Sequence, residues 1–325
     1  MAPEQGTVLR SHSGSYLVLT TGGTLVPCRA RRNLRRADPS WPEFPVPGDE
    51  VEWKPLGAGD VPGEGIIEAV RPRRSEIARQ RSGAKHVVVA NIDQLVVVMA
   101  VREPVLDRGL LDRLLATAER NRLAACVCLH KADLAPAEEY EPARRVYERA
   151  GYAVLCTSAV SGAGLQELRQ RLCGSVGVFM GASGAGKSHL ISALQPGLKL
   201  RTGMVSQRTG LGQHTTTRVD LHRTDFGALL ADTPGVREFS LWRLAPEELG
   251  NLFPEFRRVQ GGCRFAGCMH VPEPGCAVKL EVEAGDIDAG RHRSYQAILE
   301  DLRQGASDPG PTRRQKRVPR KERSP

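Results

Sequence analysis

The stretch GASGAGKS at residues 181–188 decides the fold class of this 325-residue chain. It fits the pattern G-x-x-x-x-G-K-[ST], and it stands between the apolar run VGVFM and the helix-forming run KSHLISALQ. A buried strand that leads through a glycine-rich loop into a helix is the context in which this pattern binds phosphates. The stretch therefore predicts the phosphate loop of a nucleotide-binding α/β domain.

The residues of this loop have separate expected roles. Backbone N–H groups of the glycine-rich turn would surround the phosphates. Lys187 would reach the β and γ phosphates, and the Ser188 hydroxyl would ligate Mg²⁺. The phosphate-binding residues expected from the loop and the first helical turn are Gly181, Ala182, Ser183, Gly184, Ala185, Gly186, Lys187, Ser188 and His189.

Two further segments would complete the magnesium and γ-phosphate site. In ADTPGV (231–236), Asp232 ends an apolar run and would hold Mg²⁺ through water, while the Gly235 N–H would meet the γ-phosphate. Between this segment and the phosphate loop lies GLGQHTTTRVD (210–220). Here we favour Thr216 over Thr215 as a Mg²⁺ ligand that is released when the γ-phosphate is lost.

Two loops nearer the N-terminus are expected to bind the base. In LHKAD (129–133), Asp133 would accept two hydrogen bonds from guanine and Lys131 would pack over the ring. His130 stands where GTPases usually have Asn; it offers a ring N–H but not the paired donor and acceptor of an amide. In CTSAVSG (156–162), the Ser158 and Ala159 backbone would lie near guanine O6. Both loops precede the phosphate loop, which is the reverse of the usual order and indicates a circular permutation.

The flanking segments indicate a multidomain chain. Residues 1–75 alternate apolar and polar positions between Gly turns, which favours a five-stranded barrel of oligonucleotide-binding type. Residues 76–85 would be a linker within a domain spanning 76–242. There HVVVANIDQLVVVMAV would supply two strands of a parallel sheet, and alternating strands and helices predict a doubly wound α/β fold. Residues 243–304 would form a small helical domain, and residues 305–325 a disordered basic tail.

A cluster of metal-ligating side chains lies in the third segment. The pattern C-x₄-C-x-H-x₅-C places Cys263, Cys268, His270 and Cys276 within fourteen residues. Three thiolates and one imidazole can form the closed tetrahedral shell of a structural zinc site. We therefore expect one structural Zn²⁺, while the other cysteines lack such neighbours.

Charge and hydropathy restrict the partners. The segment 311–325 holds seven Lys or Arg residues and one Glu, so it carries +6 of the formal net charge of +9. The runs 28–36 and 71–81 contain five Arg each. This distribution favours a polyanion such as RNA, although a solvated tail that aids solubility is the alternative. No run is long and apolar enough for a membrane span, and MAPEQGTVLR lacks the apolar core of a signal peptide. We therefore expect a cytoplasmic protein without a membrane partner. We also expect a monomer.

The set of motifs, in this order, resembles the ribosome small-subunit-dependent GTPase A family. The matching stretches are VVVANIDQLVVV, LLDRLL, LHKAD, TSAVSGAGL, GASGAGKS, GQHTTT, DTPGVREFSL and the Cys/His cluster. The resemblance implies an N-terminal oligonucleotide-binding barrel, a circularly permuted GTPase domain and a C-terminal zinc domain. It also implies a GTP hydrolase, with GTP and Mg²⁺ at its site, that binds the small ribosomal subunit and its rRNA, acts late in subunit maturation and is stimulated by the subunit.

Three positions depart from the expected patterns. His130 replaces the family's usual Asn, and Gln213 stands where the family commonly has Arg. Val236 follows DTPG in place of the water-orienting Gln of Ras-like proteins, so another group must position the attacking water. The resemblance implies His214 in this role, and a loop histidine without a role is the alternative. Lys187 and Thr216 are the other expected catalytic residues.

Three functions remain open from the sequence. The first is an RNA-bound GTPase of ribosome assembly, which the barrel, the zinc cluster and the basic tail favour together. The second is a non-enzymatic RNA-binding protein in which the nucleotide is only a structural ligand. The third is an ATPase, which the substitution at His130 leaves open.

Overall fold

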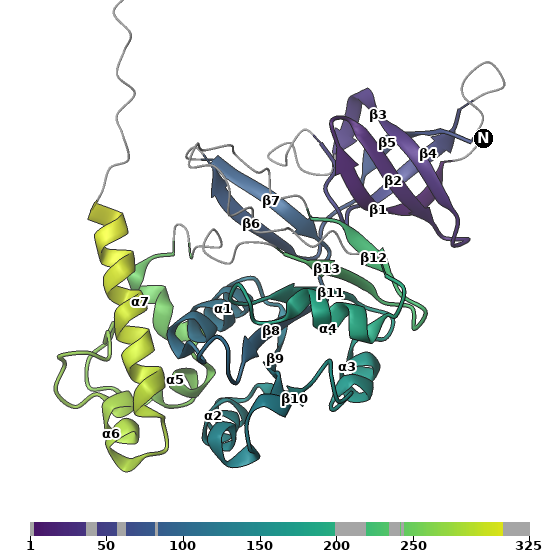
Figure 1. Ribbon diagram of the computed structural model, residues 1–325. Coiled ribbons are helices and arrows are strands. Elements are labelled where there is room, and N and C mark those ends of the chain that lie inside the picture. The colour runs from purple at the N-terminus through teal and green to yellow at the C-terminus, as the bar shows by residue number, and fades with distance from the viewer. Residues whose placement is uncertain are drawn as a thin grey trace, which may run out of the picture.

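The computed structural model describes residues 3–36, 44–56, 63–81, 84–198, 219–233, 241 and 244–307. Figure 1 shows a barrel near the N-terminus, a central sheet with helices on it, and a group of helices that includes the long α7 (Ala289–Ser307). The tail from residue 308 lies outside the described residues. So do several positions singled out in the sequence, namely Gln213, His214, Thr215, Thr216, Gly235 and Val236.

The N-terminal segment forms the expected closed five-stranded barrel. Its strands follow the order β1-β2-β3-β5-β4, and β1 pairs with β4 to close it. The parallel pair is β3 with β5, and the other neighbours are antiparallel. Inward-facing apolar residues, among them Val8, Val18, Trp53 and Ile67, fill the interior. The strands are β1 (Glu4–His12), β2 (Ser15–Thr20), β3 (Leu25–Arg36), β4 (Glu50–Pro55) and β5 (Gly65–Val70).

The segment expected to be a linker is instead a hairpin. Strand β6 (Glu76–Arg81) pairs antiparallel with β7 (Ala84–Ala90) in a separate two-stranded sheet. The prediction that HVVVA belongs to the parallel sheet was therefore wrong. Ile77, Val87 and Val89 are almost fully buried, so the apolar alternation that looked like a sheet strand serves to pack this hairpin onto the molecule.

The central sheet has the predicted doubly wound architecture. Its order is β10-β9-β8-β11-β13-β12, and all neighbours are parallel except the edge pair β12–β13. Apolar side chains of α1 and α2 pack with one side of the sheet, and those of α3 and α4 pack with the other. The strands are β8 (Gln94–Ala100), β9 (Ala124–His130), β10 (Ala153–Thr157), β11 (Val176–Met180), β12 (Leu221–Arg223) and β13 (Leu229–Asp232). The helices are α1 (Arg108–Arg120), α2 (Ala137–Ala150), α3 (Leu165–Leu172) and α4 (Lys187–Leu194), with a short 3₁₀ turn, η1 (Ala132–Leu134).

The order of strands explains the unusual order of motifs. Strands β8, β9 and β10 precede β11 in sequence and lie on one side of it, whereas β12 and β13 follow it and lie on the other. The direction of winding therefore reverses between β8 and β11. In open α/β sheets this switch point, at the carboxyl ends of the strands, is where ligands bind.

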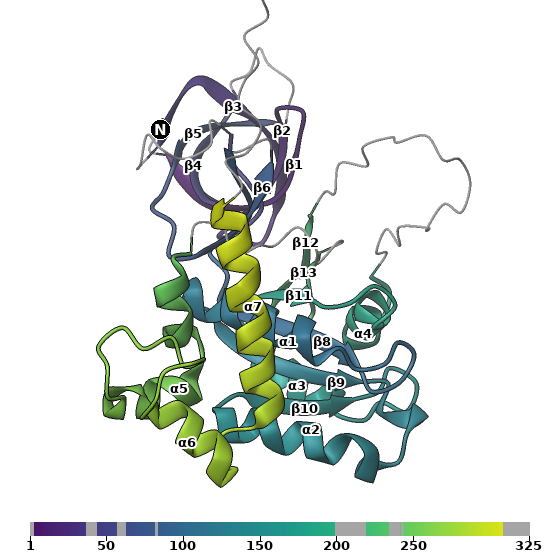
Figure 2. The same cartoon turned by 90° about the vertical axis from the view of Figure 1, so that its left-hand side faces the viewer.

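The C-terminal segment is helical and packs against the central domain. Helix α7 contacts α1, in front of which it stands in Figure 2, and apolar residues of both contribute to one core with Phe253, Phe256 and Tyr295. Besides α7, its elements are η3 (Pro246–Leu252), α5 (Pro254–Val259), η4 (Gln260–Gly262) and α6 (Ala277–Ala284). No helix in the described ranges combines the length and apolarity needed to cross a membrane.

Candidate functional site

The phosphate loop leaves β11 at the switch point and is pressed against β8. Gly181 has a φ of 154°, and a Cβ there would lie 1.9 Å from the Val98 carbonyl oxygen of β8. Gly184 and Gly186 also have positive φ values, 77° and 95°. The glycines of the motif are thus required both by close approach and by backbone conformation. The helix α4 begins directly after Gly186, so its N-terminal N–H groups face the loop.

The Lys187 ammonium is folded back onto this loop. Its Nζ donates to the carbonyl oxygens of Gly181 at 2.9 Å and Ala182 at 3.0 Å. Burial lowers the pKa of Lys187, and the nearby Asp232 carboxylate opposes that shift. The loop therefore holds a cation at its centre, where an anionic phosphate can replace the carbonyls as partner.

The two described residues predicted to bind magnesium are in contact. The Ser188 hydroxyl, in the first turn of α4, donates to Oδ2 of Asp232 at the end of β13. Thr233, which follows Asp232, is 1% exposed, and its Oγ1 donates a hydrogen bond to the Phe179 carbonyl oxygen at 2.8 Å. This bond fixes the chain to β11 as it leaves β13. A hydroxyl beside a carboxylate at the lip of a phosphate loop is a donor set suited to Mg²⁺.

The two base-loop segments are joined by a hydrogen bond. Ser158 Oγ donates to Asp133 Oδ1 at 2.5 Å and accepts from the N–H groups of Val160 and Ser161, at 3.1 and 3.0 Å. The Ser158 hydrogen bond lowers the pKa of the exposed Asp133 carboxyl. The carboxylate is consequently ionised and oriented at neutral pH, as an acceptor of base N–H groups must be.

His130 occupies a different environment from Asp133. It is 2% exposed, its Nδ1 lies 2.9 Å from Thr157 Oγ1, and its ring lies against Gly186 of the phosphate loop. Burial lowers the pKa of His130. A neutral imidazole therefore connects β9, β10 and the phosphate loop.

A further loop of the site carries no motif. In the β8–α1 connection, the Glu103 carbonyl oxygen accepts a hydrogen bond from Lys131 Nζ, and Pro104 Cδ lies 3.7 Å from the Cβ position of Gly184. Sequence reasoning missed this loop because nothing in its composition distinguishes it. Only the adjacency of β8 to β11 brings it between the base loop and the phosphate loop.

The Cys/His cluster converges on one point in the C-terminal domain. The ligand atoms of Cys263, Cys268, His270 and Cys276 all lie within 4.8 Å of one another. His270 Nδ1 is 3.4 Å from Cys276 Sγ and 3.7 Å from Cys263 Sγ. Ligand atoms around a tetrahedral Zn²⁺ would be separated by about 3.4–3.8 Å. The arrangement therefore fits a four-coordinate metal ion.

The surrounding residues hold these ligands in place. Glu273 accepts hydrogen bonds from the N–H groups of Met269 and Val271, at 3.1 and 3.0 Å. His292 and Tyr295 of α7 bind the carbonyl oxygens of His270 and Met269, at 2.8 and 2.9 Å. Helix α7 therefore links the metal loop to the core shared with α1.

Known proteins resemble this chain over most of its length. The model of the RsgA GTPase family matches residues 70–242. "Small ribosomal subunit biogenesis GTPase RsgA" of Moorella thermoacetica is 41% identical over 92% of this chain and 97% of that protein, and the protein of that name from Actinobacillus pleuropneumoniae is 39% identical over 91% and 85%.

Two solved structures superpose on most of this chain. YjeQ from Thermotoga maritima superposes with a TM-score of 0.74 at 32% identity, over 92% of this chain and 98% of that one. YloQ, described as a circularly permuted GTPase, gives 0.72 at 28% identity over 93% and 96%. With the family model covering the central sheet and relatives matching nearly end to end, this chain belongs to the RsgA GTPase family.

Proposed function

We propose that this protein binds the small ribosomal subunit and assists its late maturation, hydrolysing GTP to GDP and phosphate with stimulation by the subunit. The observation that supports this most is the convergence of three pairs at one edge of the sheet: Lys187 with the phosphate loop, Ser188 with Asp232, and Ser158 with Asp133. These are the groups needed to bind a triphosphate, a magnesium ion and a guanine base. The names of the relatives supply the ribosomal role.

The proposed GTP site includes both described and undescribed residues. Ser188, Thr216 and Asp232 would bind Mg²⁺, and Lys187, Thr216 and His214 would act on the γ-phosphate. The residues predicted from the sequence to contact GTP are His130, Lys131, Asp133, Ser158, Ala159, the stretch 181–189, Asp232 and Gly235.

The observed contacts suggest how the described residues act. Lys187 would exchange its two carbonyl partners for β- and γ-phosphate oxygens and neutralise charge that develops on them. Ser188 would exchange its bond to Asp232 for the magnesium ion, which Asp232 would help to hold through water. Mg²⁺, when bound, would neutralise phosphate charge. Asp133, held by Ser158, would fix the base so that the γ-phosphate meets the attacking water in line.

The connections of the sheet suggest how nucleotide state reaches the other domains. Strand β12, which follows the stretch 210–220, lies beside the barrel. Arg223 of β12 donates to the Gly23 carbonyl oxygen at 2.8 Å, and Arg10 of β1 lies 3.6 Å from Asp220. The chain beyond Asp232 leads to the C-terminal domain. We therefore propose that GTP favours one arrangement of barrel and zinc domain, and that hydrolysis relaxes it and releases the protein from its RNA.

Zinc and RNA complete the proposal. The donor set of three thiols and one imidazole favours Zn²⁺, in a structural role because all four positions are filled by protein.

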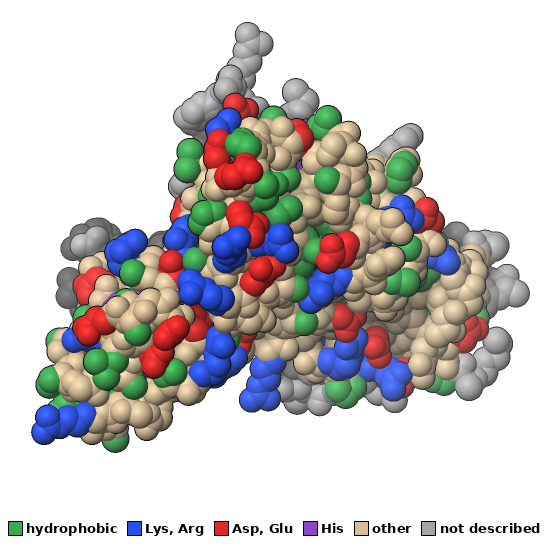
Figure 3. All heavy atoms as spheres, turned by 90° about the horizontal axis from the view of Figure 1, so that it is seen from below, with side chains coloured by type: hydrophobic (Ala, Val, Ile, Leu, Met, Phe, Trp, Pro, Cys, Tyr) green, Lys and Arg blue, Asp and Glu red, His purple; other side chains and the backbone are tan. Residues whose placement is uncertain are grey.

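RNA binding would use the barrel and the tail. On the face seen from below, Lys and Arg side chains are interspersed with Asp and Glu over the described residues, so this face offers no continuous basic surface (Figure 3). We also propose that the protein acts as a cytoplasmic monomer.

The deciding experiment is GTP hydrolysis by the purified protein with and without isolated small subunits, with the K187A variant as the background. Strong stimulation by subunits is expected. Nucleotide binding without stimulated turnover would favour the non-enzymatic alternative. Competition by ATP as effective as that by GTP would favour an ATPase. Equal subunit affinity with GDP and with a non-hydrolysable GTP analogue would contradict the release model.

A further inference from the structure

The His130 ring lies where three segments of the nucleotide site meet. It stands at the end of β9, it is 2% exposed, and its Nδ1 is 2.9 Å from the hydroxyl of Thr157 at the end of β10. On its other side is the phosphate loop. A Cβ added to Gly186 would lie 2.7 Å from His130 Cδ2 and 3.0 Å from Nε2. The ring therefore fills the space that the missing side chain of Gly186 leaves.

Both ring nitrogens face other parts of the protein. Nδ1 is engaged by Thr157, and Nε2 faces the backbone of the phosphate loop. The acceptors that guanine offers to a ring N–H on its major-groove edge are N7 and O6, and a side chain that is buried between two strands and a loop presents no free edge to them. The carboxylate of Asp133, by contrast, is exposed and oriented by Ser158.

The position of His130 gives it a mechanical effect on the site. Gly186 is the last residue before α4, so its place sets that of Lys187 and of the helix N-terminus. Thr157 directly precedes Ser158, which holds the base-reading carboxylate. Because the sugar fixes the distance between a base and its phosphates, affinity requires these two loops to be held at a matching separation.

We propose that His130 is a positioning residue that holds the phosphate loop at a fixed separation from the base loops and makes no contact with guanine. Base selection then falls to Asp133 and the Ser158 loop alone. The proposal rests on the guanine nucleotide site described under Proposed function, and it assigns His130 a different task from the base-reading one suggested by its place in LHKAD.

The test compares nucleotide affinities of the full-length wild type, H130A and T157V for GTP, 7-deaza-GTP and 6-thio-GTP. The two analogues change the N7 and O6 acceptors. H130A should weaken all three by the same factor, roughly tenfold, so that their ratios stay as in the wild type. T157V, which removes only the hydroxyl, should cause a smaller uniform loss. The double variant should be no weaker than H130A, because both changes release the same contact.

Either of two results would overturn the proposal. A ratio of GTP to 7-deaza-GTP or 6-thio-GTP that shifts in H130A would show that the ring reads the base. Unchanged affinity for all three nucleotides would show that it positions nothing. Thermal midpoints measured in parallel identify a variant that is merely unfolded, in which case T157V carries the test.

The D133N variant tests the guanine nucleotide site separately from the role of His130. An Asn at this position can accept from and donate to the base, and it should favour xanthine, which carries an oxygen where guanine has its amino group. If D133N leaves the preference for GTP over XTP unchanged, the guanine site itself is wrong, whatever the result for His130.

Discussion

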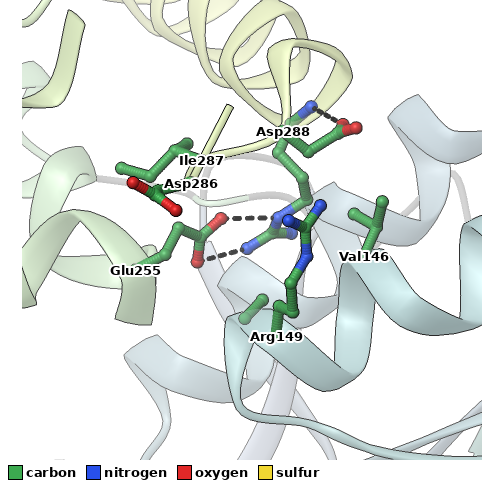
Figure 4. A pocket seen from close by; sticks show the side chains of 8 residues that line it. Val146, Arg149, Glu255, Asp286, Ile287 and Asp288 are labelled. Carbon is green, nitrogen blue, oxygen red and sulfur yellow. Dashed lines mark hydrogen bonds and ion pairs between the residues drawn. The ribbon is translucent and has the colours of Figure 1, made fainter. Parts of the chain in front are cut away.

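Arg291 of α7 donates from Nη1 to Asp112 Oδ1 of α1 at 2.8 Å, and both side chains are almost completely buried. The same guanidinium donates to both carboxylate oxygens of Glu255 on α5, at 2.7 and 2.9 Å, and lies 4.7 Å from the centre of the Phe253 ring. Figure 4 shows Glu255 bound in this way, beside a crevice that Arg149 of α2 also lines. A buried cation between two carboxylates therefore joins the C-terminal domain to the central one.

Replacing Arg291 by Met should destabilise the protein strongly. The variant leaves Asp112 and Glu255 buried without a cation, which costs about 3–5 kcal/mol in comparable pairs. Urea unfolding followed by fluorescence would measure the loss. As a matched control, R113A removes the partner of Asp301 on the same two helices; Arg113 is more exposed than Arg291, so its loss should cost about 0–1 kcal/mol.

The cause of that loss can be separated from the loss of packing. The triple variant R291M/D112N/E255Q removes the charges together and should be more stable than R291M alone. A triple variant as unstable as R291M would show that the shape of the arginine, and not its charge, is what the interface needs.

Loss of the Lys187 ammonium should abolish most turnover. K187A is expected to lower kcat for GTP at least about a hundredfold, because it removes a preoriented cation from developing phosphate charge. The K54A variant of the barrel, which removes a lysine paired with Glu68, serves as control and should leave intrinsic hydrolysis unchanged. Subunit-free assays with equal activity in K187A and wild type would rule out the proposed phosphate loop chemistry.

The metal site should hold one zinc ion per chain. C268S is expected to lower the bound zinc and to destabilise the C-terminal helices, since α7 is tied to the metal loop through His292 and Tyr295. C173S is the matched control, because Cys173 is exposed and lies outside the cluster. Elemental analysis together with the thermal midpoint measures both effects; full zinc retention in C268S would exclude this thiol as a ligand.

Acidification should destabilise the protein partly through His130. Burial lowers the native pKa of His130 below its ordinary value of 6.5; electrostatic interactions with Lys131 and His189 act in the same direction, and Thr157 and Asp133 oppose it. The unfolded chain therefore takes up the proton first, so this contribution is complete above about pH 6.5 and is lost as the pH falls towards the native pKa.

The variant H130N isolates that contribution. His222 also has a pKa lowered by burial, so the wild-type curve alone does not identify the group. Between pH 7.5 and 5.5 the unfolding free energy of the wild type should fall more steeply than that of H130N. Parallel curves would mean that His130 is already protonated, or solvated, in the folded protein.

Deletion of residues 311–325 should weaken RNA binding and flatten its dependence on salt. For each RNA phosphate that the tail neutralises in the full chain, the deletion should make the slope of log K against log salt shallower by about 0.7–0.9. Filter binding to rRNA at several salt concentrations measures this slope, and intrinsic GTP hydrolysis should not change. A slope identical to that of the full chain would show that the tail is only a solvated terminus.

The sequence alone determined the features that depend on local pattern. GASGAGKS between an apolar run and a helical run predicts the phosphate loop, because strand, glycine turn and helix are contiguous in the chain. The closed barrel and the four clustered metal ligands followed from alternation and spacing for the same reason. The hairpin of β6 and β7 did not, since HVVVA has the composition of a central strand and its pairing partner is decided by packing.

Only the tertiary structure decided how distant segments meet. The spacing of residues in the sequence could not show that the His130 ring packs against Gly186 or that the Glu103 carbonyl accepts a hydrogen bond from Lys131. Nor could it show that Arg291 is buried against Asp112. These contacts join segments on different strands and helices, and they exist because the order of strands places β8 beside β11 and because α7 packs on α1. Motifs such as the phosphate loop and the metal cluster consist of residues close together in the sequence, so the sequence alone can predict them. The separation of loops and the burial of charges depend instead on which surfaces the whole chain can bury together.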